Sequence, residues 1–138
     1  MPDAEAAVFL ADMSRAPLFA PGAWIQLGIA ERPAGPLVGD VGLFLSADGR
    51  SAEVGFTLAP AAQGRGIATA AVRESVRLLA AVTTAQRVLG ITDHRNGASV
   101  RVLERAGFRL HERRDVVFRG EPCTEHVYAR SLSSNDPA

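Results

Sequence analysis

Two glycines lie where an apolar strand gives way to a helix, in the run Gln63-Gly64-Arg65-Gly66-Ile67-Ala68-Thr69. The start of a helix leaves about four backbone N–H groups without a partner and carries roughly half a positive charge. Glycines allow such a backbone to come close to an oxygen-rich anion, and a phosphate or pyrophosphate is the natural ligand. Glycine-rich turns before helices are also common packing devices, so the pattern alone leaves both interpretations open.

Two familiar phosphate-binding loops are excluded for this segment. A Walker A loop ends in Gly-Lys-Ser/Thr, and the chain contains no lysine. A dinucleotide-binding loop needs two glycines ahead of a third at fixed spacing, and Gln63 to Ala68 lacks that order. We therefore expect a phosphate-binding loop of another type.

Hydrophobic periodicity and turn residues predict the elements that position this loop. Helices are expected over 3–14, 66–80 and 98–105, and strands over 23–31, 37–46, 51–58, 87–92, 108–118 and 124–132. This order predicts a mixed α/β sandwich. Because the strand at 87–92 is almost entirely apolar, we expect helices to cover both faces of the sheet there. Trp24 and Phe44 are expected in the core.

Composition limits the protein class. The 138 residues are 47% hydrophobic and fit one domain. The single cysteine, Cys123, excludes an internal disulfide framework, and the three histidines lack metal-ligand spacing, so no metal is expected. Fifteen basic and fifteen acidic residues argue against a nucleic-acid partner. No apolar run is long enough to span a membrane and no signal peptide is recognisable, which predicts a cytoplasmic protein without a membrane partner.

The positive charges are unevenly distributed. Every basic residue is arginine, and residues 63–119 hold eleven arginines against five acids. Either this is a solvated helical surface, or it is a basic rim that holds an anionic ligand such as a phosphorylated cofactor. Charge alone does not choose between them.

Two motifs together resemble one family. The run Gln63 to Ala68 fits the Gln/Arg-x-x-Gly-x-Gly/Ala signature of the GNAT family of N-acetyltransferases. Asn96-Gly97-Ala98-Ser99, followed by Val102-Leu103-Glu104-Arg105-Ala106-Gly107-Phe108, is similar to the second helix block of that family. The resemblance runs from about Trp24 to Leu132 and is strongest to the branch that acetylates ribosomal-protein N-termini. It implies an α/β (α+β) fold with a mixed, mostly antiparallel central sheet flanked by helices.

The resemblance also implies a binding site for acetyl-CoA, which would be a co-substrate. The amides of Gly64 to Thr69 would hold its pyrophosphate, and the strand at 51–58 would part from its neighbour to pair with the pantetheine arm. Asn96 would bind that arm from the opposite side. The implied cofactor-binding residues are Phe56, Thr57, Leu58, Gln63, Gly64, Arg65, Gly66, Ile67, Ala68, Thr69, Asn96 and Ser99.

Glu53 and Ser99 are the candidate catalytic residues. Glu53 lies close to the position where some family members carry a catalytic glutamate, and a carboxylate could take the proton that an attacking amine must lose. It could equally be a strand residue that faces solvent. Ser99 is placed to protonate the leaving thiol, but Asn96 and Ser99 also make a sensible helix start.

Two departures from the family pattern bear on the expectations. Many members carry a tyrosine as the thiol's acid at about the position of Leu103, which is aliphatic here. The strand and helix that usually open the family's fold are not recognisable, so we expect a single domain over 1–132 without them and a frayed tail at 133–138. The strand at 23–31 would then have an open edge, which predicts a homodimer.

The leading hypothesis is an acetyl-CoA-dependent N-acetyltransferase in which a primary amine attacks the thioester directly. The acceptor would be a peptide N-terminus or a small-molecule amine. The alternative is a non-catalytic or weakly catalytic module that binds or senses acyl-CoA. A third class is a nucleotide- or phosphate-binding protein that shares only the loop.

Overall fold

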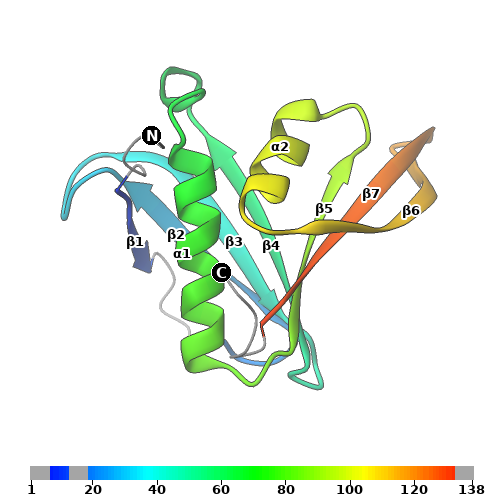
Figure 1. The fold of residues 1–138 in the computed structure, drawn as a ribbon, viewed down its shortest axis with the longest axis horizontal. Coiled ribbons are helices and arrows are strands. Elements are labelled where there is room, and N and C mark those ends of the chain that lie inside the picture. Colours follow the sequence, from blue (N-terminus) through cyan, green and yellow to red (C-terminus); the bar gives the residue numbers. More distant parts are fainter. Residues whose placement is uncertain (1–6, 13–18, 133–138) are drawn as a thin grey trace.

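The computed structural model describes residues 7–12 and 19–132, which form one seven-stranded sheet and two α-helices (Figure 1). The strands are β1 (Phe9–Asp12), β2 (Ala23–Ala30), β3 (Leu37–Leu45), β4 (Ser51–Leu58), β5 (Arg87–Asp93), β6 (Arg109–Phe118) and β7 (Glu121–Ser131). The helices are α1 (Ile67–Val82), α2 (Gly97–Arg105) and a 3-10 turn, η1 (Pro60–Ala62). No helix in this described part is long and apolar enough to cross a membrane.

The strand order is β1-β2-β3-β4-β5-β7-β6. Every neighbouring pair is antiparallel except β4 and β5, which are parallel because α1 carries the chain back between them. The prediction of a mixed, mostly antiparallel sheet is confirmed.

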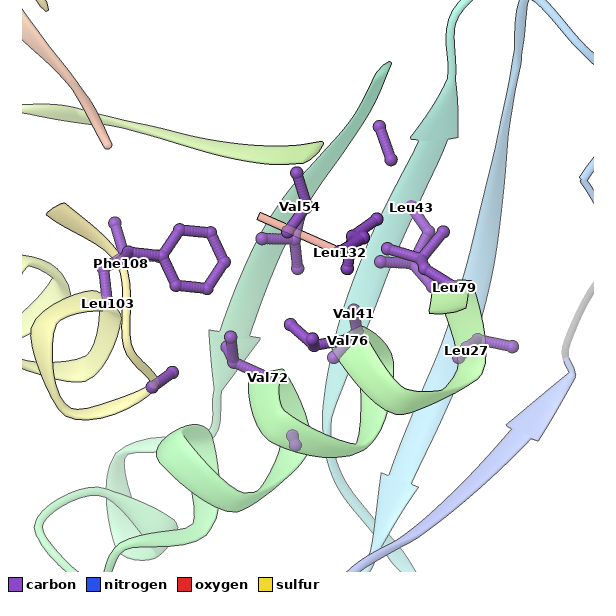
Figure 2. Packing of buried hydrophobic residues seen from close by; sticks show 14 of the residues in the cluster. Leu27, Val41, Leu43, Val54, Val72, Val76, Leu79, Leu103, Phe108 and Leu132 are labelled. Carbon is purple, nitrogen blue, oxygen red and sulfur yellow. The ribbon is translucent and has the colours of Figure 1, made fainter. Parts of the chain in front are cut away.

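Helix α1 covers the middle of the sheet with an apolar stripe. Val72, Val76 and Leu79 recur at helical spacing and pack against β3 and β4 (Figure 2). The fully buried hydroxyl of α1, Ser75 Oγ, donates to the Ala71 carbonyl at 2.8 Å and so is not left unsatisfied. This packing fixes the position of the glycine loop that precedes α1.

Helix α2 approaches β5 closely because of a glycine. A Cβ placed on Gly90 would lie 2.5 Å from the Leu103 side chain, so any larger residue would force Leu103 to shift. Gly107, with φ +92°, ends the helix in the left-handed conformation expected of a glycine cap. The close fit places the start of α2 beside the end of β5.

The helix predicted over residues 3–14 is wrong for the part that the structure describes. Residues 9–12 form β1, which pairs antiparallel with β2 from Phe9↔Ala30 to Asp12↔Leu27. Hydrogen bonding to the free edge of β2 outweighs the weak helical periodicity of this segment. The argument for a homodimer from an open edge at 23–31 therefore no longer applies. Residues 3–6 and 13–14 of the expected helix, and the tail at 133–138, lie outside the described residues.

The expectation that helices cover both faces of the sheet is also corrected. Both α-helices lie on the same face (Figure 1). On β5, Val88 and Gly90 face the helices and are buried, whereas Leu89 and Ile91 face the other way and are only half-buried. Trp24, expected in the core, is 49% exposed on this helix-free face.

Candidate functional site

The neighbouring strands β4 and β5 stop pairing with each other halfway along their length. Their parallel pairing runs from Ser51↔Arg87 to Val54↔Gly90 and then stops. Beyond that point β4 stays paired with β3 as far as Leu58, and β5 stays paired with β7 as far as Asp93. The parted edges therefore present backbone groups that no longer bond to each other, as an added strand would require.

A cleft of about 310 Å³ occupies the space between the parted strands and α2. It is lined from β4 by Val54, Gly55 and Phe56, from β5 by Gly90, Ile91, Thr92 and Asp93, and from α2 and its cap by Asn96, Ser99 and Leu103. The cleft brings together residues more than forty positions apart in the sequence. Its β4 side is apolar, whereas its β5 and α2 sides each combine polar and apolar side chains.

The glycine loop lies between the end of β4 and the start of α1. Gly64 and Gly66 have φ values of +77° and +79°, and a Cβ on either would meet nothing within 4 Å. Gly66 is the N-cap of α1 and supplies no side-chain hydrogen bond, and the first turn contains no acidic residue. The positive end of the helix is therefore uncapped and open on the side of the glycines, which fits an anion.

Two side chains of the loop are held in place by other parts of the chain. Arg65 makes a bidentate ion pair with Glu31, just after β2, at 3.1 and 2.6 Å. Gln63 Nε2 donates to the carbonyl of Leu58 at 3.2 Å and ties the loop to the end of β4. These contacts tie the loop to the ends of β2 and β4.

At the start of α2, Asn96 is the N-cap residue. Its Oδ1 accepts from the backbone N–H of Ser99 at 3.1 Å. The capping role that the sequence left open for these two residues is therefore present. Because Asn96 and Ser99 also line the cleft, the amide nitrogen of Asn96 and the hydroxyl of Ser99 are available for a second role there.

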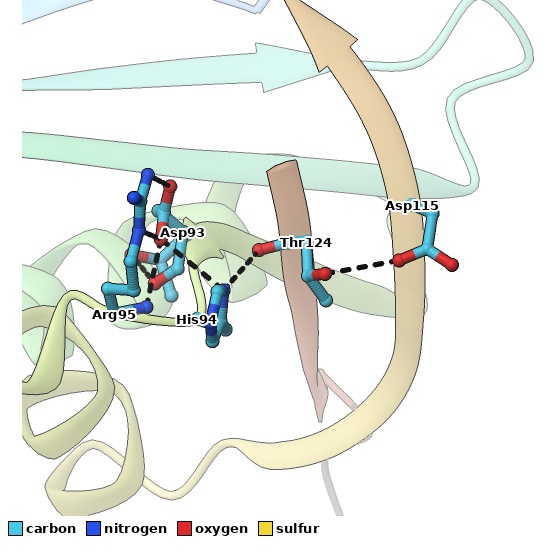
Figure 3. A network of polar contacts seen from close by, with 6 residues as sticks. Asp93, His94, Arg95, Asp115 and Thr124 are labelled. Atoms are coloured by element: carbon cyan, nitrogen blue, oxygen red, sulfur yellow. Dashed lines mark hydrogen bonds and ion pairs between the residues drawn. The ribbon is translucent and has the colours of Figure 1, made fainter. Parts of the chain in front are cut away.

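A network of polar contacts braces the loop between β5 and α2 (Figure 3). Arg95 binds both carboxylate oxygens of Asp93, at 3.0 and 2.9 Å, and this contact holds the pKa of Asp93 well below its usual range. His94 Nδ1 lies 3.1 Å from the carbonyl oxygen of Thr124, whose hydroxyl donates to Asp115. The network fixes the turn that places Asn96 at the cleft.

Comparison with protein-family models identifies the chain: the model described as an acetyltransferase (GNAT) domain matches residues 1–109. The chain belongs to the GNAT acetyltransferase family. A comparison with curated protein sequences finds no significant match.

Solved structures of GNAT acetyltransferases share the fold. A spermidine N-acetyltransferase chimera of Vibrio cholerae and hSSAT is 19% identical with a TM-score of 0.71, covering 80% of this chain and 68% of that chain. The ribosomal-protein-S5-alanine acetyltransferase of Vibrio fischeri is 18% identical, with a TM-score of 0.72 and coverages of 83% and 64%. The microcin C7 self-immunity acetyltransferase, in complex with acetyl-CoA and AMP, is 20% identical, with a TM-score of 0.69 and coverages of 78% and 61%.

Glu53 lies near the cleft but on the helix-free face. It pairs across the sheet with Phe44 on one side and Leu89 on the other. Burial raises the pKa of its carboxyl, Arg114 opposes this rise and Glu125 adds to it. A half-buried carboxylate with a raised pKa is suited to take up a proton from an amine.

The structure places three of the predicted GNAT site residues in the cleft and the other cofactor-binding candidates on the parted strand or in the glycine loop. Phe56, Asn96 and Ser99 line the cleft, Thr57 and Leu58 lie on the parted end of β4, and Gln63 to Thr69 form the loop and first turn of α1. Sequence reasoning missed Gly55, Gly90 and Asp93 in the cleft lining and Glu31 beside the loop. Of these, Gly55 and Gly90 carried a signal, as glycines inside predicted strands.

Proposed function

We propose that this GNAT chain transfers an acetyl group from acetyl-CoA to a primary amine. The observation that carries the proposal is the parting of β4 and β5 directly beside the uncapped, glycine-rich start of α1. The parted strands suit the extended, amide-bearing arm of the co-substrate, and the glycine-rich helix start suits its diphosphate. A peptide N-terminus or a small amine is the expected acceptor.

The proposed contacts follow from the donors and acceptors in the cleft. The backbone N–H groups of Gly64 to Thr69 bind the diphosphate from the side of the two glycines, where no other part of the described chain lies within 4 Å of a Cβ position. The free backbone of β4 from Gly55 to Leu58 pairs with the pantetheine amides, and the Asn96 side-chain amide donates to them from the α2 side.

The reaction needs no covalent enzyme intermediate. The amine nitrogen attacks the thioester carbonyl carbon, a C–N bond forms, and the C–S bond breaks to release the thiolate of CoA. A backbone N–H near Thr57 or Leu58 stabilises the developing oxyanion, an effect of about 3–4 kcal/mol in comparable sites. The proton of the amine passes to Glu53, directly or through water, and the thiolate takes its proton from Ser99 or from solvent.

Binding and turnover are tested separately. Thermal unfolding is followed with CoA, acetyl-CoA and ATP, because a ligand at a hundred times its dissociation constant stabilises the fold by about 2.7 kcal/mol. We expect stabilisation by CoA and acetyl-CoA. Stabilisation by ATP alone would instead support a nucleotide-binding protein.

Turnover is measured as thiol release from acetyl-CoA with a panel of primary amines. We expect release that depends on the amine. Stabilisation by CoA without release by any amine or peptide N-terminus would contradict transfer and support the alternative of an acyl-CoA-binding module.

A further inference from the structure

Asp93 closes the short turn that joins β5 to α2. Its backbone carbonyl accepts from the N–H of Asn96 at 2.9 Å, and its Oδ1 accepts from the N–H of Arg95 at 2.8 Å. A carboxylate that accepts from the backbone two residues further on holds such a turn in one conformation. The direction in which the chain enters α2 therefore depends on where the Asp93 carboxylate is held.

The side chain of Arg95 holds that carboxylate by both of its oxygens (Figure 3). Arg95 Nε donates to Oδ1 of Asp93 at 3.0 Å, and Nη2 donates to Oδ2 at 2.9 Å. A bidentate contact of this kind fixes the orientation of the carboxylate as well as its distance. The side chain of Arg95 is 72% exposed and, among the described residues, is not one of those that line the cleft. It therefore acts on the turn from outside the cleft.

The residue between these two is anchored to the neighbouring strand. His94 donates its backbone N–H to the carbonyl of Thr124 at 3.0 Å, which continues the pairing of β5 with β7 by one residue. Because His94 is fixed in this way, the remaining freedom of the turn lies in the residues that follow it. The contact between Asp93 and Arg95 removes that freedom at the position directly before Asn96.

Asn96 is the residue whose placement depends on this turn. Its Oδ1 is committed to the N–H of Ser99, so its amide nitrogen is the side-chain atom that a ligand in the cleft can engage. A displacement of the turn would move this nitrogen relative to β4, on the other side of the cleft. Because a hydrogen bond depends steeply on distance and angle, a shift of about 1 Å is enough to lose it.

An exposed ion pair elsewhere in the chain lacks these connections. Arg77 and Glu74 pair within α1, where helical hydrogen bonds already hold the backbone. Removing such a pair changes little, because exposed ion pairs contribute little by themselves. The pair of Asp93 and Arg95 differs, since its carboxylate also holds a backbone N–H and lines the cleft.

We propose that Arg95 is a positioning residue for acetyl-CoA: acting through Asp93, it holds the turn so that the amide of Asn96 meets the pantetheine arm. The proposal rests on the acetyl-transfer function proposed above and extends the binding machinery to a residue outside the cleft. Arg95 does not touch the co-substrate and takes no part in the bond-making steps. Its loss should therefore weaken binding without changing kcat at saturation.

Single variants test binding and turnover separately. The dissociation constant of CoA is measured by calorimetry, and kcat is measured with acetyl-CoA and an amine both saturating. Asn96→Ser keeps a capping oxygen but removes the amide, and should weaken CoA binding about fivefold, the equivalent of one neutral hydrogen bond. Arg95→Ala should weaken it about threefold, and Asp93→Asn, which keeps an acceptor for the Arg95 N–H, should weaken it less. Arg77→Ala is the control and should leave both quantities unchanged.

A double variant decides whether Arg95 acts through Asn96. Arg95→Ala combined with Asn96→Ser should weaken binding about fivefold in total, whereas independent contributions would multiply to about fifteenfold. A fifteenfold loss would overturn the proposal, as would Arg95→Ala with the wild-type dissociation constant or with a lowered kcat. In each of these cases the wild type still binds CoA, and the proposed function stands. A wild-type protein that does not bind CoA would overturn both.

Discussion

The two faces of this sheet are built from the same strands but have opposite character. On one face, Leu27, Val41 and Leu43 lie under α1 and are almost fully buried. On the other face, alternate residues of those strands include Trp24, Asp40 and Phe44, which are exposed or half-buried. One face therefore provides stability and holds the glycine loop, and the other leaves these side chains at the surface. The parted end of β4 belongs to both.

The largest effect is expected from a substitution on the helix-covered face. Leu79→Ala removes a side chain that has no exposed surface and packs between α1 and the sheet. We expect the free energy of unfolding to fall by about 2–5 kcal/mol in urea denaturation. Leu37→Ala, at a position 50% exposed, is the control and should cost much less. Similar losses for the two variants would contradict the assignment of the core.

A comparably large effect, on activity rather than stability, is expected from Glu53→Gln on the helix-free face. With acetyl-CoA and an amine both saturating, kcat should fall about a hundredfold if this carboxylate takes the proton of the amine. Because burial raises the pKa of Glu53, the wild-type rate should fall as the pH is lowered, and this fall should begin above the pH range in which an ordinary glutamate is protonated. An unchanged kcat across the pH range would remove Glu53 from the reaction.

The same variant should also change how the free energy of unfolding depends on pH. The folded protein holds the Glu53 proton more tightly than the unfolded chain does, so stability falls as the pH rises from the unfolded pKa, near 4.5, through the raised folded value. Glu53→Gln should make the free energy of unfolding less dependent on pH in that window. A steeper dependence in the variant would contradict the direction of the shift.

An intermediate effect is expected at the glycine loop. Gly66→Ala places a methyl group where the diphosphate is proposed to bind and forces alanine into a left-handed conformation that costs about 1–2 kcal/mol. Gly22→Ala is a matched control, because Gly22 also has φ +79° and open space around it. Both variants should lose similar stability. Only Gly66→Ala should weaken CoA binding measured by calorimetry. The expected loss is about tenfold, which corresponds to one hydrogen bond to a charged group.

The smallest effect on folding is expected from Trp24→Leu. Although tryptophan is the largest residue in the chain, it is half exposed here, and its replacement should change the free energy of unfolding by less than about 1 kcal/mol. Chemical denaturation checks this against Leu79→Ala. A loss as large as that of Leu79→Ala would mean that the helix-free face is part of the core after all.

Some of this architecture could be predicted from local patterns. The boundaries of β4 and the turn at Asp48-Gly49 follow from alternation and turn residues. The motif from Gln63 to Ala68 predicts the uncapped helix start, because glycine spacing acts directly on the backbone. The role of Asn96 as a helix cap is likewise a local property, fixed by a hydrogen bond across three residues.

Other features depend on contacts between distant segments. Residues 9–12 become a strand only because the edge of β2 is free to pair with them. Trp24 is a large apolar residue of the kind expected in a core, and it is exposed because both helices pack on the other face of the sheet. The cleft depends on where β4 and β5 stop pairing, after Val54↔Gly90, which neither strand encodes alone. The sequence by itself therefore determined the six strands β2 to β7, the turns and the glycine-rich loop, whose causes act over a few residues. Only the tertiary structure decided which face stays open, because that depends on which distant segments meet.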